Sequence, residues 1–406
     1  MATRRLYYDD SFEKEFTARV VSCDPALILA SPEAKAPAWE VILDSTAFYP
    51  TSGGQPHDLG KLGDANVFDV RDDGEEIVHL VDQPIETGEV QGCINWPRRF
   101  DHMQQHTGQH LLSAMFQERF GLPTVSFHLG AEICTIDLRG PEPTEEILEG
   151  AERAANKIIF EGRPVNVRYG TADQLSQLGV RKEVEREGIL RAIEIEAADL
   201  QPCGGTHVKH TGQIGTLLVR RCAKVRQDWR VEFLCGSRAE RAARHDFVRL
   251  RQTADRLGCA PEEVTAAAER ALSERDANFK SHRVALERLA KAEATLALQS
   301  APAGPRGLRI IARVLEDSPG EYLGFFAAKI AESEKTIALL FAKYGGHVLF
   351  AQHPSSGKDM SALLRQVLGK IGGKGGGTRD FARGRLDDPL QVESALSSAK
   401  ELLSVA

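Results

Sequence analysis

The chain has 406 residues, of which 42% are hydrophobic and 27% charged, and its formal net charge is −7. These values are ordinary for a globular protein, and no segment approaches the roughly 20 consecutive apolar residues of a membrane span. An acidic chain does not bind nucleic acid through its overall charge, so any RNA contact must come from local basic clusters. Seven scattered cysteines and a start without an apolar run favour reduced thiols in a cytoplasmic protein with no membrane contact.

Residues 1–95 are predicted to form a small N-terminal β-barrel. Apolar and polar residues alternate from Phe16 to Val20, as expected for a half-buried strand. Further short runs bounded by Gly and Asp are Trp39–Leu43, Ala65–Val70 and Glu76–Val81. The segment Phe48–Gln55 contains too many turn-forming residues to be a strand, so we expect a Gly-rich loop there.

Mixed α+β structure is expected for residues 96–240. A helix follows Pro97, because histidines and apolar residues recur at helical spacing as far as Met115. Short strands and a second helix, from about Glu145 to Phe160, are predicted after it. This part of the chain also contains the motifs that carry chemistry.

Residues 241–300 are rich in Ala, Glu, Arg and Leu, with apolar residues three or four positions apart. This pattern predicts one or two long helices broken near Gly258–Pro261. They form either a plain spacer or a coiled coil that joins two copies of the chain.

Residues 301–406 begin with a Pro- and Gly-rich linker and then alternate apolar runs with helical stretches, which favours a small C-terminal α/β domain. The domain ends in the Gly-rich segment Gly372–Gly377 and a final helix. The predicted fold class is therefore α+β and multidomain.

Two short motifs offer metal ligands. His106 and His110 lie four residues apart and therefore on one face of the predicted helix. Cys203 and His207 enclose a Gly-Gly pair that permits a tight bend of the backbone. One thiolate and three imidazoles form a ligand set suited to zinc.

Spacing alone leaves alternatives open. His102 repeats the same spacing to His106, and His210 follows His207 by three residues, so either could replace a ligand. Four protein ligands are typical of a structural zinc, whereas a catalytic zinc usually keeps a position for water. The residues by themselves permit both kinds of site.

The motifs resemble those of a known family. Residues 106–114 (HTGQHLLSA) and 203–208 (CGGTHV) are similar to the paired zinc motifs of alanyl-tRNA synthetase editing domains. Residues 46–60 resemble the Gly-rich loop that precedes that editing domain, and residues 372–377 resemble the Gly-rich C-terminal domain of the same synthetases. In order and spacing, essentially the whole chain resembles the long form of the free-standing alanyl-tRNA editing proteins.

This resemblance implies a trans-editing hydrolase that deacylates mischarged tRNA(Ala), chiefly Ser-tRNA(Ala), with Gly-tRNA(Ala) as a second substrate. Only about 45 residues precede Thr46, so we expect no aminoacylation domain and no charging of tRNA. The resemblance places Thr46 and Gln55 near the ester as catalytic residues. It also implies one zinc ion per chain, bound by His106, His110, Cys203 and His207.

The loop departs from the family pattern in one place. It reads Pro50-Thr-Ser-Gly-Gly-Gln55, where many relatives have three glycines before the glutamine. We interpret Ser52 as a turn residue, although its hydroxyl could also lie near the substrate. The preference between serine and glycine therefore stays open.

Local basic clusters are the expected tRNA contacts. Arg220 and Arg221 belong to one cluster, and Lys374, Arg379 and Arg383 flank the C-terminal glycines, whose mobile amides would suit phosphate binding. The competing interpretation makes such clusters solvated surface, and the C-terminal domain a module for packing or homodimer formation.

An alternative function from another class is a non-catalytic RNA- or protein-binding module with a structural zinc. The intact loop carrying Thr46 and Gln55 favours the enzyme, because a binding module has no need of it.

Overall fold

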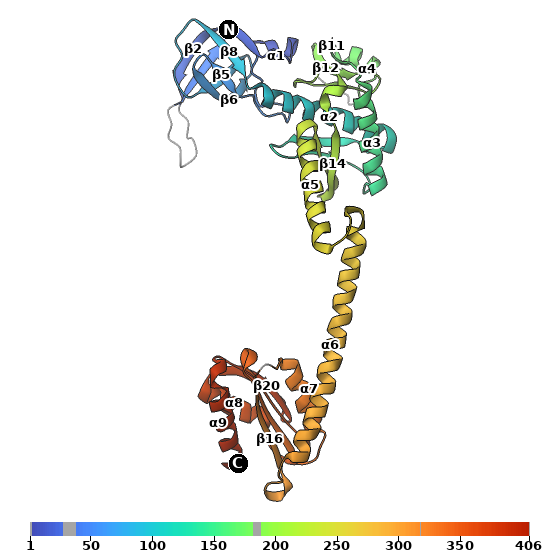
Figure 1. The fold of residues 1–406 in the computed structure, drawn as a ribbon. Helices are drawn as coiled ribbons and strands as arrows, with labels where there is room; N and C mark the ends of the chain where they lie inside the picture. Colours follow the sequence, from blue (N-terminus) through green and yellow to red (C-terminus); the bar gives the residue numbers. More distant parts are fainter. Residues whose placement is uncertain (1, 27–37, 182–187, 317, 406) are drawn as a thin grey trace. The chain divides into compact units, whose positions relative to one another are not determined.

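The structure is a computed structural model that describes residues 2–26, 38–181, 188–316 and 318–405. The chain divides into two compact units, Met1–Gln252 and Thr253–Ala406 (Figure 1). Helices and strands are mixed in both, which confirms the predicted α+β multidomain class. Among the described helices, none has the length and apolar character needed to cross a membrane.

The first sheet of the N-terminal unit closes on itself. Its strands are β2 (Glu15–Pro25), β3 (Trp39–Leu43), β5 (Gly60–Leu62), β6 (Ala65–Asp73), β7 (Glu76–Val81) and β8 (Glu89–Ile94). Each pairs antiparallel with the next in the order β2, β3, β7, β6, β5, β8, and β8 pairs back with β2. Phe16, Ala18 and Val20 are buried while the residues between them are exposed, so the interior is filled by apolar side chains.

A long loop leaves this barrel. The loop begins after the short strand β4 (Ser45–Thr46). This strand pairs in parallel with β1 (Arg4–Arg5), and the one-turn helix α1 (Leu6–Asp9) follows β1. The predicted Gly-rich loop is confirmed, since its only pairing is the isolated bridge between Ser52 and Gln55.

Helix α2 (Trp96–Phe120) is the central element of the second half of this unit. Asn95 caps its start, Pro97 lies in its first turn, and Gly121, with a φ of 65°, ends it in the left-handed conformation. Every residue from His102 to Phe116 is buried. A helix buried on all sides must be enclosed by packed elements, and its polar residues must find partners among them.

Strands of two antiparallel sheets, the helix α3 and the turn η1 pack around α2. The first sheet has the order β14-β15-β10-β9 and the second the order β11-β12-β13. Their strands are β9 (Thr124–Leu129), β10 (Cys134–Leu138), β11 (Val165–Gly170), β12 (Leu190–Ile195), β13 (Asp199–Pro202), β14 (Leu217–Val225) and β15 (Asp228–Cys235). The other elements are α3 (Glu145–Glu161), which packs on α2, α4 (Ala172–Gln177) and the 3₁₀ turn η1 (Thr211–Ile214).

Two long helices follow, as predicted. They are α5 (Gly236–Leu257), which crosses the boundary between the two units, and α6 (Val264–Ser300). The break between them contains Gly258, with a φ of 65°, and the short turn η2 (Pro261–Glu263).

The C-terminal unit contains a five-stranded sheet of order β16-β17-β18-β20-β19. Its elements are β16 (Arg309–Leu315), α7 (Gly320–Ala331), β17 (Thr336–Ala342), β18 (His347–Gln352), α8 (Met360–Ile371), β19 (Gly373–Gly377), β20 (Phe381–Leu386) and α9 (Val392–Val405). Short turns are η3 (Pro305–Gly307), η4 (Tyr344–Gly346), η5 (Pro354–Ser356) and η6 (Pro389–Gln391). The side chains of β17 alternate between two cores, one shared with α6 and α7 and the other with α8 and α9.

The glycine-rich segment is not the mobile loop that we expected. Its residues form the edge strand β19, which pairs antiparallel with β20. Glycine is required there because the two backbones approach closely: a Cβ on Gly375 would lie 2.7 Å from the Cα of Gly384, and one on Gly377 would lie 2.2 Å from the carbonyl oxygen of Phe381. The glycines therefore serve strand pairing.

Candidate metal centre

The two ligand motifs meet in the structure. His106 and His110 project from the same side of α2, with ring centroids 5.2 Å apart. The segment after β13 brings the ring of His207 to 4.4 Å from that of His106. Gly205 is required in this segment, because a Cβ there would lie 2.2 Å from Cε1 of His106. The ligand atoms of all four residues, with Cys203 as the fourth, lie within 4.8 Å of one another.

Hydrogen bonds orient the three imidazoles. Their Nδ1 atoms are held by partners outside the group: His106 by Gln55 Oε1 at 2.9 Å, His110 by Asp199 Oδ2 at 3.2 Å, and His207 by Thr107 Oγ1 at 3.1 Å. The hydroxyl of Thr107 donates to a backbone carbonyl, so it must accept from its histidine. Each ring therefore carries a proton on Nδ1, which makes Nε2 the atom that would bind a metal.

The separations between ligand atoms fit a single tetrahedral zinc ion. Sγ of Cys203 lies 3.5 Å from Nε2 of His106 and 3.3 Å from Nε2 of His207. Zinc–sulfur and zinc–nitrogen bonds of about 2.3 and 2.0 Å at a tetrahedral angle place sulfur and nitrogen about 3.5 Å apart. The donor set and its geometry therefore suit zinc.

The two alternative histidines do not join this group within the part of the chain that the structure describes. His102 is buried, which lowers its pKa to about 3, and its Nδ1 has no hydrogen-bond partner. His210 is exposed and precedes η1.

Charges and burial within the group favour the metal-binding forms of Cys203 and His207 but not that of His110. Burial by itself would raise the pKa of the Cys203 thiol, but His106 and His207 hold that pKa well below its ordinary value. Burial lowers the pKa of His207 to about 3, so its ring is neutral. Burial also opposes a charge on His110, yet hydrogen bonds to Asp199 and Cys203 raise its pKa to about 9. Ligation by His110 therefore releases a proton.

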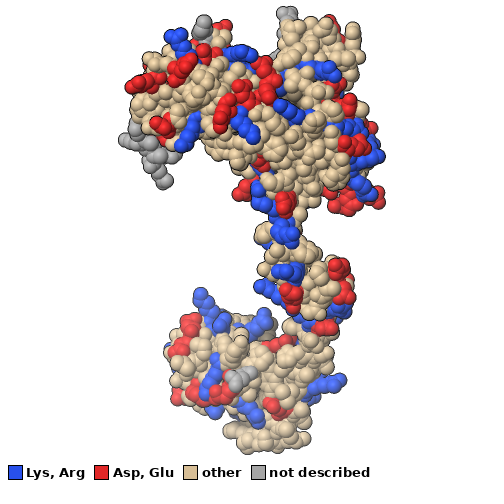
Figure 2. Space-filling view, turned by 45° about the horizontal axis from the view of Figure 1, so that its top comes forward, with Lys and Arg blue, Asp and Glu red and all other residues tan. Residues whose placement is uncertain are grey.

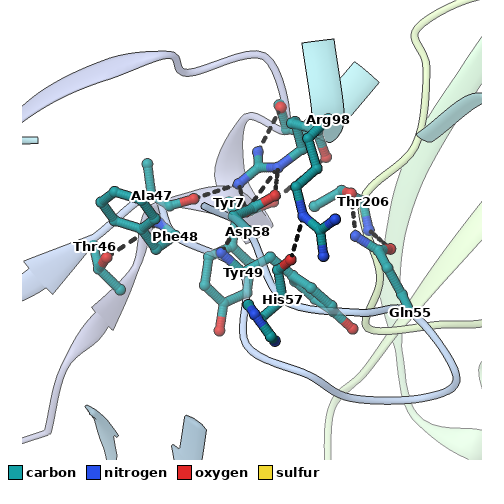
Figure 3. Close-up of polar contacts among 12 residues, drawn as sticks. Tyr7, Thr46, Ala47, Phe48, Tyr49, Gln55, His57, Asp58, Arg98 and Thr206 are labelled. Carbon is teal, nitrogen blue, oxygen red and sulfur yellow. Dashed lines mark hydrogen bonds and ion pairs between the residues drawn. The ribbon is translucent and has the colours of Figure 1, made fainter. Parts of the chain in front are cut away.

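Gln55 connects the barrel loop to His106 and to Thr206, and Figure 3 shows its contact with Thr206. Its Oε1 accepts from Nδ1 of His106 and, at 3.1 Å, from the backbone N–H of Thr206. Its Nε2 donates to the hydroxyl of Thr206 at 2.8 Å. Both ends of this fully buried carboxamide are thus engaged, and Gln55 orients one ligand directly and the ligand-bearing segment 203–207 through Thr206.

Thr46 lies at the other end of the loop. Its hydroxyl is hydrogen-bonded to Nε2 of the buried His79 at 2.8 Å and accepts the backbone N–H of Phe48 at 3.1 Å. In Figure 3 it lies apart from the Gln55–Thr206 pair. The structure therefore brings Gln55 to the metal ligands and places Thr46 at the barrel, where it holds the start of the loop.

A buried ion pair fixes the loop on α2. The Asp58 carboxylate accepts from Nε of Arg99 at 3.0 and 2.9 Å and from the backbone N–H of Tyr49 at 2.6 Å. Both charged side chains are fully buried. Nε of Arg98 also donates to the carbonyl of His57 at 3.0 Å (Figure 3). The loop is thereby fastened about two turns before the first metal ligand.

Sequence reasoning missed the residues that orient the ligands. Thr107 and Thr206 lie inside the two motifs, so their positions beside the ligands offered a signal. Asp199 lies four residues before Cys203 with no recognisable pattern, and it is also held by Nε of Arg181 at 2.7 Å. Only the folded chain brings this buried carboxylate to His110.

A cavity of about 280 Å³ opens beside the ligands. Tyr49, Ser52 and Gly53 of the barrel loop form one wall. His110, Cys203 and residues of β9 and β13 form the rest. Ser52 thus lines the cavity, which gives its hydroxyl a place near a bound molecule.

The predicted tRNA contacts lie in both units. Arg220 and Arg221 are exposed on β14, and Arg220 is paired with Asp246. Lys374 and Arg383 line a groove of about 970 Å³ in the C-terminal unit, whereas Arg379 donates to the backbone carbonyls of Gly357 and Lys358. On the face shown in Figure 2, basic and acidic side chains are intermingled.

Comparisons with known proteins find two related domains and relatives that cover nearly the whole chain. Residues 190–228 match the threonyl and alanyl tRNA synthetase second additional domain, and residues 308–405 match the DHHA1 domain. The chain is 32% identical to the alanyl-tRNA editing protein AlaX-L of Pyrococcus horikoshii, covering 94% of each chain. It is 30% identical to the alanyl-tRNA editing protein Aarsd1 of Rattus norvegicus, covering 97% of this chain and 98% of that one.

These matches define a protein that contains domains of the threonyl- and alanyl-tRNA synthetase kind. The chain belongs to the family of alanyl-tRNA editing proteins. It is also 31% identical to the alanine–tRNA ligase of Pyrococcus abyssi, over 99% of this chain but only 44% of that ligase. The chain thus spans less than half the length of the ligases it matches.

Proposed function

We propose that this protein is a zinc-dependent, cytoplasmic hydrolase that removes the wrong amino acid from mischarged tRNA(Ala). Serine is the chief amino acid removed and glycine the second. The observation that carries the proposal is the Cys/His₃ group beside a cavity of about 280 Å³, supported from the barrel by Gln55. The names of the related editing proteins agree with it.

The side chains of this protein would position the substrate. His106, His110, Cys203 and His207 would hold the zinc ion, which when bound supplies a Lewis acid at the wall of the cavity. Gln55 keeps the first of these ligands in its ligand tautomer, and Thr46 keeps the loop in place. An activated ester then needs little more than a positioned water and donors for the developing oxyanion.

The cavity suits a small amino acid with a hydroxyl group. At about 280 Å³ it lies just below the roughly 300–1,000 Å³ of most ligand pockets. Its lining includes Gln201, whose Oε1 is buried and has no hydrogen-bond donor among the described residues. A seryl hydroxyl could supply that donor, whereas an alanyl methyl would leave the oxygen unpaired.

One assay tests the activity. The purified protein should release serine from Ser-tRNA(Ala) and glycine from Gly-tRNA(Ala) much faster than it releases alanine from Ala-tRNA(Ala). Cys203→Ala should abolish release. Equal rates on all three substrates, or no release from any of them, would refute the proposal.

A second candidate is a non-catalytic RNA- or protein-binding module with a structural zinc. The observation in its favour is that four protein side chains converge, as in closed structural sites. This second function predicts that zinc stabilises the fold and that the zinc-loaded protein releases no serine from Ser-tRNA(Ala).

We further propose that residues 301–406 bind the tRNA body. Residues 241–300 then act as a spacer. They connect this unit to the N-terminal barrel, residues 1–95, and the editing domain, residues 96–240. Lys374 and Arg383 are exposed at one groove and are the proposed phosphate contacts there; Arg379 and Arg221 are secondary ones. Each phosphate contact adds affinity and salt dependence without reading sequence. The same unit, or the spacer, could instead support a homodimer.

A matched pair of variants separates these roles. Lys374→Ala with Arg383→Ala should weaken tRNA binding and reduce the slope of affinity against salt concentration. Arg365→Ala with Lys400→Ala removes the same charge from α8 and α9 outside the groove and should leave both unchanged. An unchanged slope in the first variant, together with an altered mass in light scattering, would favour the dimer.

A further inference from the structure

A second cavity, of about 410 Å³, shares a wall with the candidate metal centre. Its lining includes Tyr8, Phe12, Asn166, Arg191, Lys209 and His210. The segment 203–207 contributes to both cavities, since His207 lines this one and Cys203 lines the smaller one. The metal ligands therefore lie between two spaces of different size.

Arg191 brings an uncompensated positive charge to this cavity. Its Nη1 donates to the carbonyls of Cys203 at 2.7 Å and Gly205 at 3.0 Å, but its Nε and Nη2 have no partner among the described residues. No described carboxylate forms an ion pair with it. The two acids that line the cavity are already engaged, Asp9 by Arg4 and Asp10 by Lys209. A guanidinium in this state favours an anionic ligand.

Aromatic rings accompany this charge. The centroid of the Tyr8 ring lies 5.4 Å from the guanidinium carbon of Arg191 and 5.8 Å from that of Arg5. The Tyr8 hydroxyl borders the exposed Gly204, where an added Cβ would lie 3.5 Å away. Lys209 lies 4.7 Å over the ring of Phe12. Aromatic rings stack on bases and nearby cations hold phosphates, which is how proteins bind single-stranded RNA ends.

We propose that this cavity binds the 3′-terminal adenosine nucleotide of the tRNA, with the base on Tyr8 and the phosphate toward Arg191. The inference rests on the proposed function. The substrate is an ester between an amino acid and the ribose of that nucleotide, so its two parts need a small space and a larger one. Cavities of about 280 and 410 Å³ that share the segment 203–207 provide both, and the ester then lies over that segment.

Adenosine monophosphate is the probe that tests the cavity directly. Calorimetric titration of the full-length, zinc-loaded protein with AMP should show binding, and Tyr8→Ala should weaken it by about 5- to 150-fold, the usual worth of base stacking. Phe160→Ala, which removes another exposed ring of the same unit outside the cavity, should leave binding unchanged. Absence of AMP binding at millimolar concentration, or equal binding by Tyr8→Ala, would overturn the proposal.

The phosphate contact and the reaction give independent measurements. Arg191→Lys should reduce the preference for AMP over adenosine, and zinc analysis of the same variant shows whether the ligand segment is intact. In deacylation of Ser-tRNA(Ala), Tyr8→Ala should raise KM with little change in kcat. If AMP binds through Tyr8 but no serine is released, the proposed function fails and the nucleotide site stands. If serine is released while Tyr8→Ala changes neither KM nor AMP binding, the nucleotide site fails alone.

Discussion

Replacing Gln55 with alanine should weaken zinc binding as well as the fold. Gln55 is fully buried and makes hydrogen bonds to Nδ1 of His106 and to the N–H and hydroxyl of Thr206. The alanine variant loses all three bonds and leaves their buried partner groups without the hydrogen bonds that Gln55 supplied. Because His106 also loses the group that fixes its tautomer, the effect reaches the metal.

The expected magnitudes follow from these contacts. Three hydrogen bonds at about 0.5–1.5 kcal/mol each give a loss of about 2–4 kcal/mol in the free energy of unfolding. Loss of the partner of a metal-binding histidine typically lowers metal affinity by about 10- to 100-fold. Chelator competition on the folded variant measures the affinity, and denaturant unfolding of the zinc-loaded protein measures the stability.

Gln104→Ala is the matched control. Gln104 is also buried and lies on α2, the helix that carries His106 and His110. Its Nε2 donates to the carbonyl of Gln213 and not to a candidate metal ligand. This variant should lose stability and keep its zinc affinity. If Gln55→Ala binds zinc as tightly as Gln104→Ala does, then Gln55 does not orient His106 and the reasoning is wrong.

Three further perturbations test the centre and its surroundings. Cys203→Ala with His207→Ala should reduce zinc from one per chain to none in elemental analysis, and full retention would rule out this ligand set. Gly205→Ala should lower zinc affinity, because its Cβ would lie 2.2 Å from Cε1 of His106; unchanged affinity by chelator competition would contradict the close approach. Burial lowers the pKa of His79 to about 4, so the unfolded chain takes up a proton first as the pH falls from about 6.5. The free energy of unfolding should therefore fall by up to about 3 kcal/mol between pH 6.5 and 4 relative to His79→Gln, and parallel pH profiles of the two proteins would refute this.

Local pattern was sufficient for the long helices, for several strands and for the two motifs that carry the candidate ligands. The alternation of apolar and polar residues from Phe16 onward and the apolar run of β17 each predict a strand. Both patterns can be recognised within a few residues of the sequence. Composition predicts the two long helices, and the segment Gly258–Pro261 predicts the break between them. In the structure Gly258 adopts the left-handed conformation at this break. Likewise, the helical spacing of His106 and His110 placed both on one face before any contact was known.

The roles of the residues around the metal could not be read in the same way. Sequence alone left His102 and His210 as possible ligands, and it treated Thr46 and Gln55 alike. The packing of the barrel loop against α2 separates that pair, because burial of Asp58 with Arg99 fixes where each end of the loop lies. The glycine run of the C-terminal unit forms an edge strand because it pairs in a hairpin with the next strand, β20, and the close approach of the two backbones requires glycine.

The sequence by itself therefore determined which residue types are available and which of them share a helix face or a tight turn. Tertiary structure alone decided which distant groups complete the site. Asp199 reaches His110 from 89 residues away, and Arg191 and Tyr8 meet from opposite ends of the N-terminal unit. The physical reason is that hydrogen bonds and ion pairs depend on distance in space, and long-range packing sets that distance where no periodicity along the chain records it.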